Sequence, residues 1–119
     1  MVLVGFAATD GEQTLQWMSN KILSLRLFAD DEGKMNLDLA AAQGELLVVS
    51  QFTLYGDCKK GKRPSFDKSA PAELAAGLYD RFLDIVRTQA PGKVDSGVFK
   101  THMLVNLVND GPVTFMVEK

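Results

Sequence analysis

Two segments of this 119-residue chain repeat an apolar residue every three or four positions, which is the spacing of one helical face. The residues of the first face are Leu15, Met18, Ile22 and Leu25. Those of the second face, which follows Pro71 and is broken by Pro91-Gly92, are Leu74, Leu78, Phe82 and Ile85. Because each helix has to bury its apolar face against another element, the chain is restricted to folds in which two helices cover a partner layer.

Apolar runs before, between and after the two helical segments predict the strands of that partner layer. Met1–Ala8 precedes the first helix, and Glu45–Leu54, which gives the strongest strand signal, lies between the two. Leu25–Leu27 and the polar turn at Asp30–Lys34 predict a further strand and a reversal. The tail predicts two more strands, Met103–Val108 and Val113–Val117.

This order of elements predicts an α/β fold, with α+β left open because one sequence does not establish parallel pairing. At 119 residues we expect a single domain over 1–119, a mixed sheet covered by two amphipathic helices. With 46% hydrophobic and 24% charged residues, the composition is that of an ordinary globular protein.

Charge, hydropathy and cysteine content exclude several functional classes. A net charge of −2 argues against a protein that coats nucleic acid. No apolar stretch approaches the roughly 20 residues of a membrane span, and no signal peptide is visible, so a cytoplasmic location without membrane contact is expected. The single cysteine, Cys58, excludes an internal disulfide and a multi-cysteine zinc site, and we expect neither a metal nor another cofactor.

The only basic cluster of the chain lies in the loop predicted at Tyr55–Asp67. Four of the 13 basic residues fall within one five-residue window: Lys59, Lys60, Lys62 and Arg63. The cluster is a candidate phosphate contact, and the alternative is an ordinary solvated surface.

Two further segments combine polar and turn-forming residues in unusual places. The strand run Val48–Leu54 carries Ser50, Gln51 and Thr53 near its end, which is typical either of a functional site or of an edge strand with one face in water. In the tail, Pro112 removes a backbone donor where a hairpin would pair. Turn chemistry alone favours an ordinary trans Gly111-Pro112 bond.

Together, Ser50-Gln51-Phe52-Thr53-Leu54 and Asn109-Asp110-Gly111-Pro112-Val113-Thr114 resemble the two signature motifs of the D-aminoacyl-tRNA deacylases. The resemblance covers essentially the whole chain, because other segments fall in the family's order and spacing: Lys60–Phe66, Leu78-Tyr79, Phe82, Gly97–Phe99 and Met103.

The resemblance implies a homodimer with its active site at the interface. A cis Gly111-Pro112 of one subunit would reach into the partner's pocket beside Ser50–Thr53. Its backbone carbonyls would face the α-carbon of the substrate, accept a D-aminoacyl group and clash with an L side chain. Glycine, which has no side chain, would also enter.

The implied reaction is hydrolysis of the ester between the amino acid and the terminal ribose of tRNA, with the basic cluster contacting tRNA. Ser50 and Gln51 would anchor the substrate or stabilise the oxyanion, Thr53 would line the pocket, and Thr114 would support the Gly-Pro turn. The remaining implied substrate-binding residues are Phe52, Phe99 and Met103. Phe66 and Phe99 are candidates for stacking on the terminal adenine, with core packing equally open.

Two other functions remain open on the sequence. One is an esterase or peptidase with Thr53 as nucleophile, although the only histidine, His102, is distant in sequence and is typical of a surface or packing residue. The other is a tRNA-binding or interaction protein without catalysis.

The chain departs from the family pattern at two places. Family members begin with a further strand pair, so this chain opens at what resembles their third strand, and we expect Met1–Ala8 to form an exposed edge. Lys100-Thr101 replaces the small residues that commonly follow the phenylalanine, which predicts a narrower amino-acid pocket or side chains turned outward.

Overall fold

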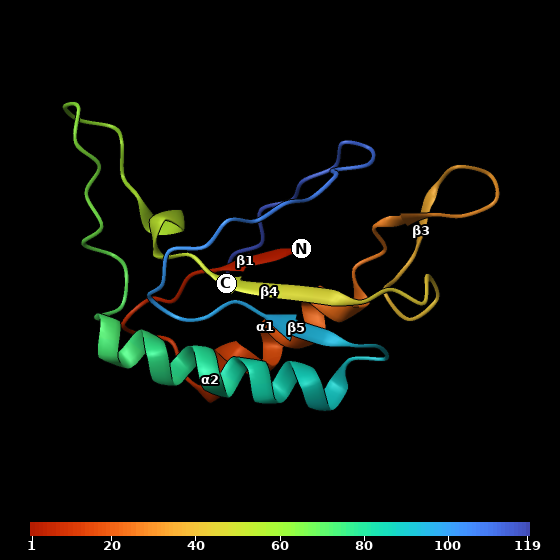
Figure 1. Cartoon of the computed structure of the whole chain (residues 1–119), viewed down its shortest axis with the longest axis horizontal. Coiled ribbons are helices and arrows are strands. Elements are labelled where there is room, and N and C mark those ends of the chain that lie inside the picture. Colours follow the sequence, from red (N-terminus) through yellow and green to blue (C-terminus); the bar gives the residue numbers. More distant parts are fainter.

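The computed structural model describes residues 1–119 and has a three-stranded parallel sheet at its centre. The strands are β1 (Val2–Val4), β4 (Leu46–Ser50) and β5 (Val94–Ser96), in the spatial order β1-β4-β5 (Figure 1). Val48 of β4 is the central residue of the sheet, since it pairs with Val2 on one side and Ser96 on the other. The α/β class is therefore confirmed, with parallel pairing of the central strands.

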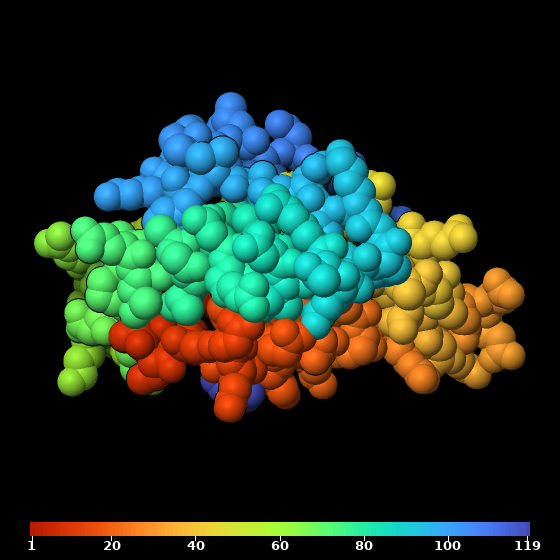
Figure 2. Space-filling view, turned by 90° about the horizontal axis from the view of Figure 1, so that it is seen from below, coloured from red at the N-terminus to blue at the C-terminus, as the bar shows by residue number.

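Two helices, α1 (Glu12–Ser24) and α2 (Ala72–Gln89), pack side by side on one face of this sheet (Figures 1 and 2). Both β-α-β connections step across the sheet in the same direction, from β1 to β4 and from β4 to β5. Because such connections are right-handed, both helices are placed on the same face. Phe82 of α2 is fully buried at the centre of the core and meets Phe6 edge-on, with ring centroids 6.2 Å apart.

Polar contacts also join the two helices. The hydroxyl of Ser19, which is 0% exposed, donates to Oε1 of Gln89 at 2.7 Å. At the surface, Arg81 pairs with Glu12 and lowers the pKa of that carboxyl group. The sequence pattern predicted neither the buried position of Ser19 nor its partner.

The predicted helical faces are largely confirmed. Leu15, Phe82 and Ile85 are buried, and Met18, Ile22 and Leu78 are half-buried against the core. The prediction was wrong for Leu74, which is 42% exposed. Ala75 in the same turn is buried in the core, so Leu74 lies at the edge of the buried helical face and not within it.

The segment between α1 and β4 contains a short antiparallel pair, β2 (Phe28–Ala29) and β3 (Met35–Leu37). The reversal predicted at Asp30–Lys34 is present, and Asp30 holds it by accepting from the backbone N–H groups of Glu32 and Lys34, both at 2.9 Å. The strand predicted at Leu25–Leu27 begins later in the chain, as β2 at Phe28, because Leu25 is still the C-cap of α1.

Four predicted strands differ in the structure. Met1–Ala8 forms a strand only over Val2–Val4, and the strand predicted through Leu54 ends at Ser50. The 3-10 helix η1 (Phe52–Tyr55) follows it, because the Leu54 N–H turns back to the Gln51 carbonyl at 3.3 Å. Residues 101–119 contain no strand, since alternation forms one only where a neighbour supplies ladder hydrogen bonds.

Candidate functional site

The first wall of the candidate site is the carboxyl end of β4. Ser50 pairs with Val4 and is half-buried, and the next N–H, that of Gln51, donates to the Val4 carbonyl at 2.7 Å. A Cβ at Gly5 would lie 3.1 Å from the Gln51 carbonyl oxygen, so the glycine lets the chain after β1 approach closely. Ser50 and Gln51 are therefore held by backbone contacts to β1.

The side chains beyond β4 contact one another. The Gln51 side-chain amide donates to the Thr53 hydroxyl across the first turn of η1. The first hydrogen bond of that turn is made by the Leu54 N–H, so the N–H groups of Phe52 and Thr53 precede it and point out of the helix. The site thus presents amide donors and two hydroxyl groups, those of Ser50 and Thr53.

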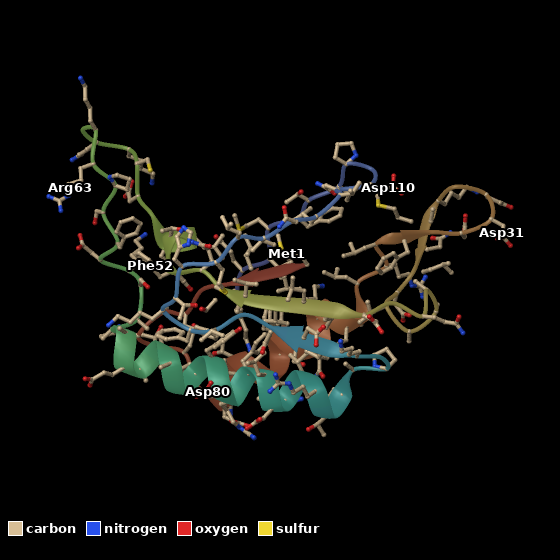
Figure 3. The ribbon with its side chains drawn as sticks, in the orientation of Figure 1. Met1, Asp31, Phe52, Arg63, Asp80 and Asp110 are labelled. Carbon is tan, nitrogen blue, oxygen red and sulfur yellow. The ribbon has the colours of Figure 1, made fainter.

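Phe52 connects this wall to the basic loop. Phe52 is 56% exposed and meets Phe66 edge-on, with ring centroids 5.0 Å apart. Asp57 and Ser65 close the loop through two backbone hydrogen bonds of 2.8 and 3.0 Å. The basic cluster, all exposed, lies at the protruding tip beyond this closure (Figure 3): Lys59, Lys60, Lys62 and Arg63.

The second wall is the chain after β5. A Cβ at Gly97 would lie 3.0 Å from Met103 Sδ and 3.4 Å from Val49 Cγ1, so the glycine brings Met103 against β4. Phe99 is half-buried and packs on the ring of Tyr79, with centroids 6.1 Å apart. The structure therefore brings Phe99 and Met103 to the sheet end that carries Ser50.

Gly111, Pro112 and Thr114 are exposed in the tail and do not join this site within one chain. In Figure 3, Phe52 and the tail loop that carries Asp110 both lie on the side of the sheet away from the helices, Phe52 toward the left and Asp110 toward the right. The Gly111-Pro112 peptide bond is cis, as the family resemblance implied, and differs from the expectation of turn chemistry alone. Gly111 has φ 147°, in the region that favours glycine.

Lys100 has a left-handed backbone with φ 59° and an exposed side chain. Such a conformation costs an L residue roughly 1–2 kcal/mol. Replacing Lys100 by glycine is therefore expected to raise the free energy of unfolding by about 0.5–1 kcal/mol, since part of the gain is lost to the flexibility of unfolded glycine. Urea titration measures the change. Lys100→Ala serves as the control because it removes the side chain but keeps the strain, and an equal gain there would contradict the backbone explanation.

The remaining polar candidates do not join the site. His102 and Cys58 are exposed, and no group of three His, Cys, Asp or Glu residues is arranged to hold a metal ion. None of the helices combines the length and the apolar character that a membrane span requires. Two surface hollows of about 460 and 240 Å³ are lined mainly by helix residues, none of them a predicted site residue.

Two residues near the site, Gly97 and Tyr79, were named at the sequence level only for their family spacing and were assigned no role. Gly97 gave no signal apart from the family spacing. Tyr79 lies among the apolar residues of α2, and a buried tyrosine hydroxyl requires a hydrogen-bond partner. This requirement could have drawn attention to Tyr79, because it predicts a hydrogen-bond acceptor for its hydroxyl group inside the sheet.

The fold and the site define a class of protein: an α/β protein whose candidate site lies at the carboxyl ends of parallel strands, as is usual for ligand sites in such sheets. The family model for D-Tyr-tRNA(Tyr) deacylase matches residues 1–118. The chain belongs to this family of ester hydrolases.

Two relatives named D-aminoacyl-tRNA deacylase illustrate the similarity. The protein of Thermotoga petrophila is 49% identical over 118 residues, which are 99% of this chain and 78% of the relative. That of Chlorobaculum tepidum is 52% identical, with 99% of this chain and 79% of the relative covered.

Solved structures agree with the fold. The structure of a c-Myc DNA unwinding element binding protein matches with a TM-score of 0.91 and 39% identity, covering 98% of this chain and 79% of its own. A probable eukaryotic D-amino acid tRNA deacylase matches with a TM-score of 0.69 over 84% of this chain and 74% of its own. At 21% identity, the second match supports the fold alone.

Proposed function

We propose that the chain hydrolyses the ester bond of D-aminoacyl-tRNA, and of glycine mischarged on tRNA, releasing the free amino acid and tRNA. The observation that carries this proposal is the convergence of Ser50–Thr53, Phe99 and Met103 at one sheet end in a chain 49% identical to a protein named D-aminoacyl-tRNA deacylase.

The polar groups of this site suit ester hydrolysis by placement and charge stabilisation. An aminoacyl ester is reactive enough that water can attack it once its carbonyl group is oriented, with or without assistance from a ribose hydroxyl group. The Gln51 side-chain amide and the backbone N–H groups of Phe52 and Thr53 are candidate donors to the oxyanion. Ser50 would anchor the substrate. Phe99 and Met103 would supply the apolar wall of the amino-acid pocket.

The contact of the Thr53 hydroxyl argues against a covalent mechanism. Its hydrogen-bond partner is the Gln51 side-chain N–H, which is a donor and has no basic lone pair to remove a proton. A threonine nucleophile needs such a base. We therefore assign Thr53 to the lining of the pocket and favour the water route.

The selectivity for D-amino acids would come from a second copy of the chain. Gly111-Pro112 is exposed and lies away from Phe52 in its own chain (Figure 3), so a partner subunit is needed to bring the two motifs together. Apolar side chains along the same tail, Leu104, Val108 and Met116, are largely exposed and available for such an interface.

The test compares D-Tyr-tRNA, Gly-tRNA and L-Tyr-tRNA as substrates of the purified protein. We expect the D form to be hydrolysed at least about 100-fold faster than the L form. Equal rates would contradict the chiral proposal. Tight tRNA binding without hydrolysis would instead support a binding protein, and a trapped acyl group on Thr53 would support the esterase alternative.

Neutralising the basic cluster is expected to weaken tRNA binding without affecting the chemistry. With Lys59, Lys60, Lys62 and Arg63 all changed to glutamine, KM for D-Tyr-tRNA should rise and the slope of log KM against log salt should fall by up to about 3, since each phosphate contact contributes about 0.7–0.9. Hydrolysis of D-tyrosyl-adenosine, which lacks these phosphates, should be unchanged. Lys21→Gln on α1 is the matched control. An unchanged salt slope in the fourfold variant would show that the loop is only solvated surface.

A further inference from the structure

The phenol of Tyr79 is buried directly beneath the candidate site. Tyr79 projects from α2 into the sheet and is 2% exposed. Its hydroxyl lies 2.9 Å from the Val48 carbonyl oxygen and 3.1 Å from the Gly97 carbonyl oxygen. One hydroxyl proton is thus shared between two carbonyl groups on different segments of the chain.

These two carbonyl groups mark the point where β4 and β5 separate. The last registered pair is Val48 with Ser96, and the Gly97 N–H then donates to the Val48 carbonyl at 2.8 Å. Beyond the last strand pair, the phenol therefore links the two segments from the helix side of the sheet, where direct pairing between them has ended.

Each segment leads within two residues to one wall of the site. Ser50 follows Val48, and Phe99 follows Gly97 and packs on the Tyr79 ring at 36° between the planes. Burial raises the pKa of Tyr79, with a smaller opposing contribution from Arg87, so the hydroxyl keeps its donor proton at neutral pH.

We propose that Tyr79 is a positioning residue for hydrolysis: its hydroxyl fixes the separation between the Ser50–Gln51 wall and the Phe99–Met103 wall of the amino-acid pocket. It would act through Ser50 and Phe99 rather than through the substrate. This role rests on the proposed function, because the two walls matter for catalysis only if the pocket between them holds the aminoacyl group.

The experiment compares Tyr79→Phe with Ser19→Ala. Both variants remove one buried hydroxyl group, but that of Ser19 joins α1 to Gln89 at the C-terminal end of α2 and contacts neither β4 nor β5. We expect Tm to fall in both variants. Tyr79→Phe should lower kcat for D-Tyr-tRNA about tenfold, since small displacements of oriented groups have large effects on rate. KM should stay within about twofold, and Ser19→Ala should leave both constants unchanged.

Amide hydrogen exchange provides a readout that does not depend on activity. In Tyr79→Phe the amides of Ser50, Gln51 and Phe99 should exchange at least about tenfold faster, while those at the centre of α2 remain protected. Unchanged exchange, or an equal loss of kcat in both variants, would overturn the positioning role. If the unmodified protein leaves D-Tyr-tRNA intact, the proposed function fails, and the exchange result alone decides whether Tyr79 fixes the two walls.

Discussion

Replacing Gly111 by alanine is expected to reduce the hydrolysis of D-Tyr-tRNA by about 100-fold and to shift Tm by less than about 2 °C. A Cβ at Gly111 would lie 2.9 Å from the Val113 backbone nitrogen, and its φ of 147° is one that L residues rarely adopt. The turn has to move to accept the methyl group. Because the turn is exposed, its movement leaves the packing of the core, and therefore Tm, nearly unchanged.

The matched control is Gly33→Ala in the turn between β2 and β3. Gly33 also has a positive φ, 78°, but a Cβ there meets nothing within 4 Å. Its variant should carry comparable backbone strain and keep full activity. Steady-state hydrolysis and a thermal melt of both variants give the comparison. Full activity of Gly111→Ala would contradict the proposal that this turn forms part of the chiral filter.

Replacing Phe82 by alanine is expected to lower the free energy of unfolding by about 3–5 kcal/mol. Phe82 is 0% exposed and lies between the sheet and the helix layer, where its ring meets Phe6. The surrounding side chains belong to regular elements, so they cannot collapse fully into the cavity. Urea denaturation followed by circular dichroism measures the loss.

Leu74→Ala on the same helix is the control for this effect. It belongs to the same helical periodicity, but its side chain is 42% exposed, so the loss should stay below about 1 kcal/mol. Phe82→Leu should fall between the two, because it retains most of the apolar volume. Equal losses for Phe82→Ala and Leu74→Ala would mean that periodicity alone, rather than packing on the sheet, determines stability.

Part of the candidate site could be predicted from the sequence, and part depends on contacts that only the folded chain makes. Ser50-Gln51-Phe52-Thr53 and Gly111-Pro112 were predictable as motifs because they are contiguous in sequence. The closeness of Met103 to Val49, and of Phe99 to Tyr79, was not predictable without family knowledge. It depends on how the chain after β5 folds back over β4, a contact between residues that are distant in sequence.

The sequence by itself determined the two helices, the existence of a central strand within Glu45–Leu54 and the turn at Asp30–Lys34, because periodicity, proline and local hydrogen bonding act within a few residues. Only the tertiary structure decided the parallel order β1-β4-β5, the exposure of Leu74 and the absence of strands in 101–119. A strand exists only where another segment completes its hydrogen bonds, and burial exists only where another layer lies opposite. For the same reason the sequence assigned Tyr79 no role beyond its family spacing: its partners, Val48 and Gly97, meet it only in the folded sheet.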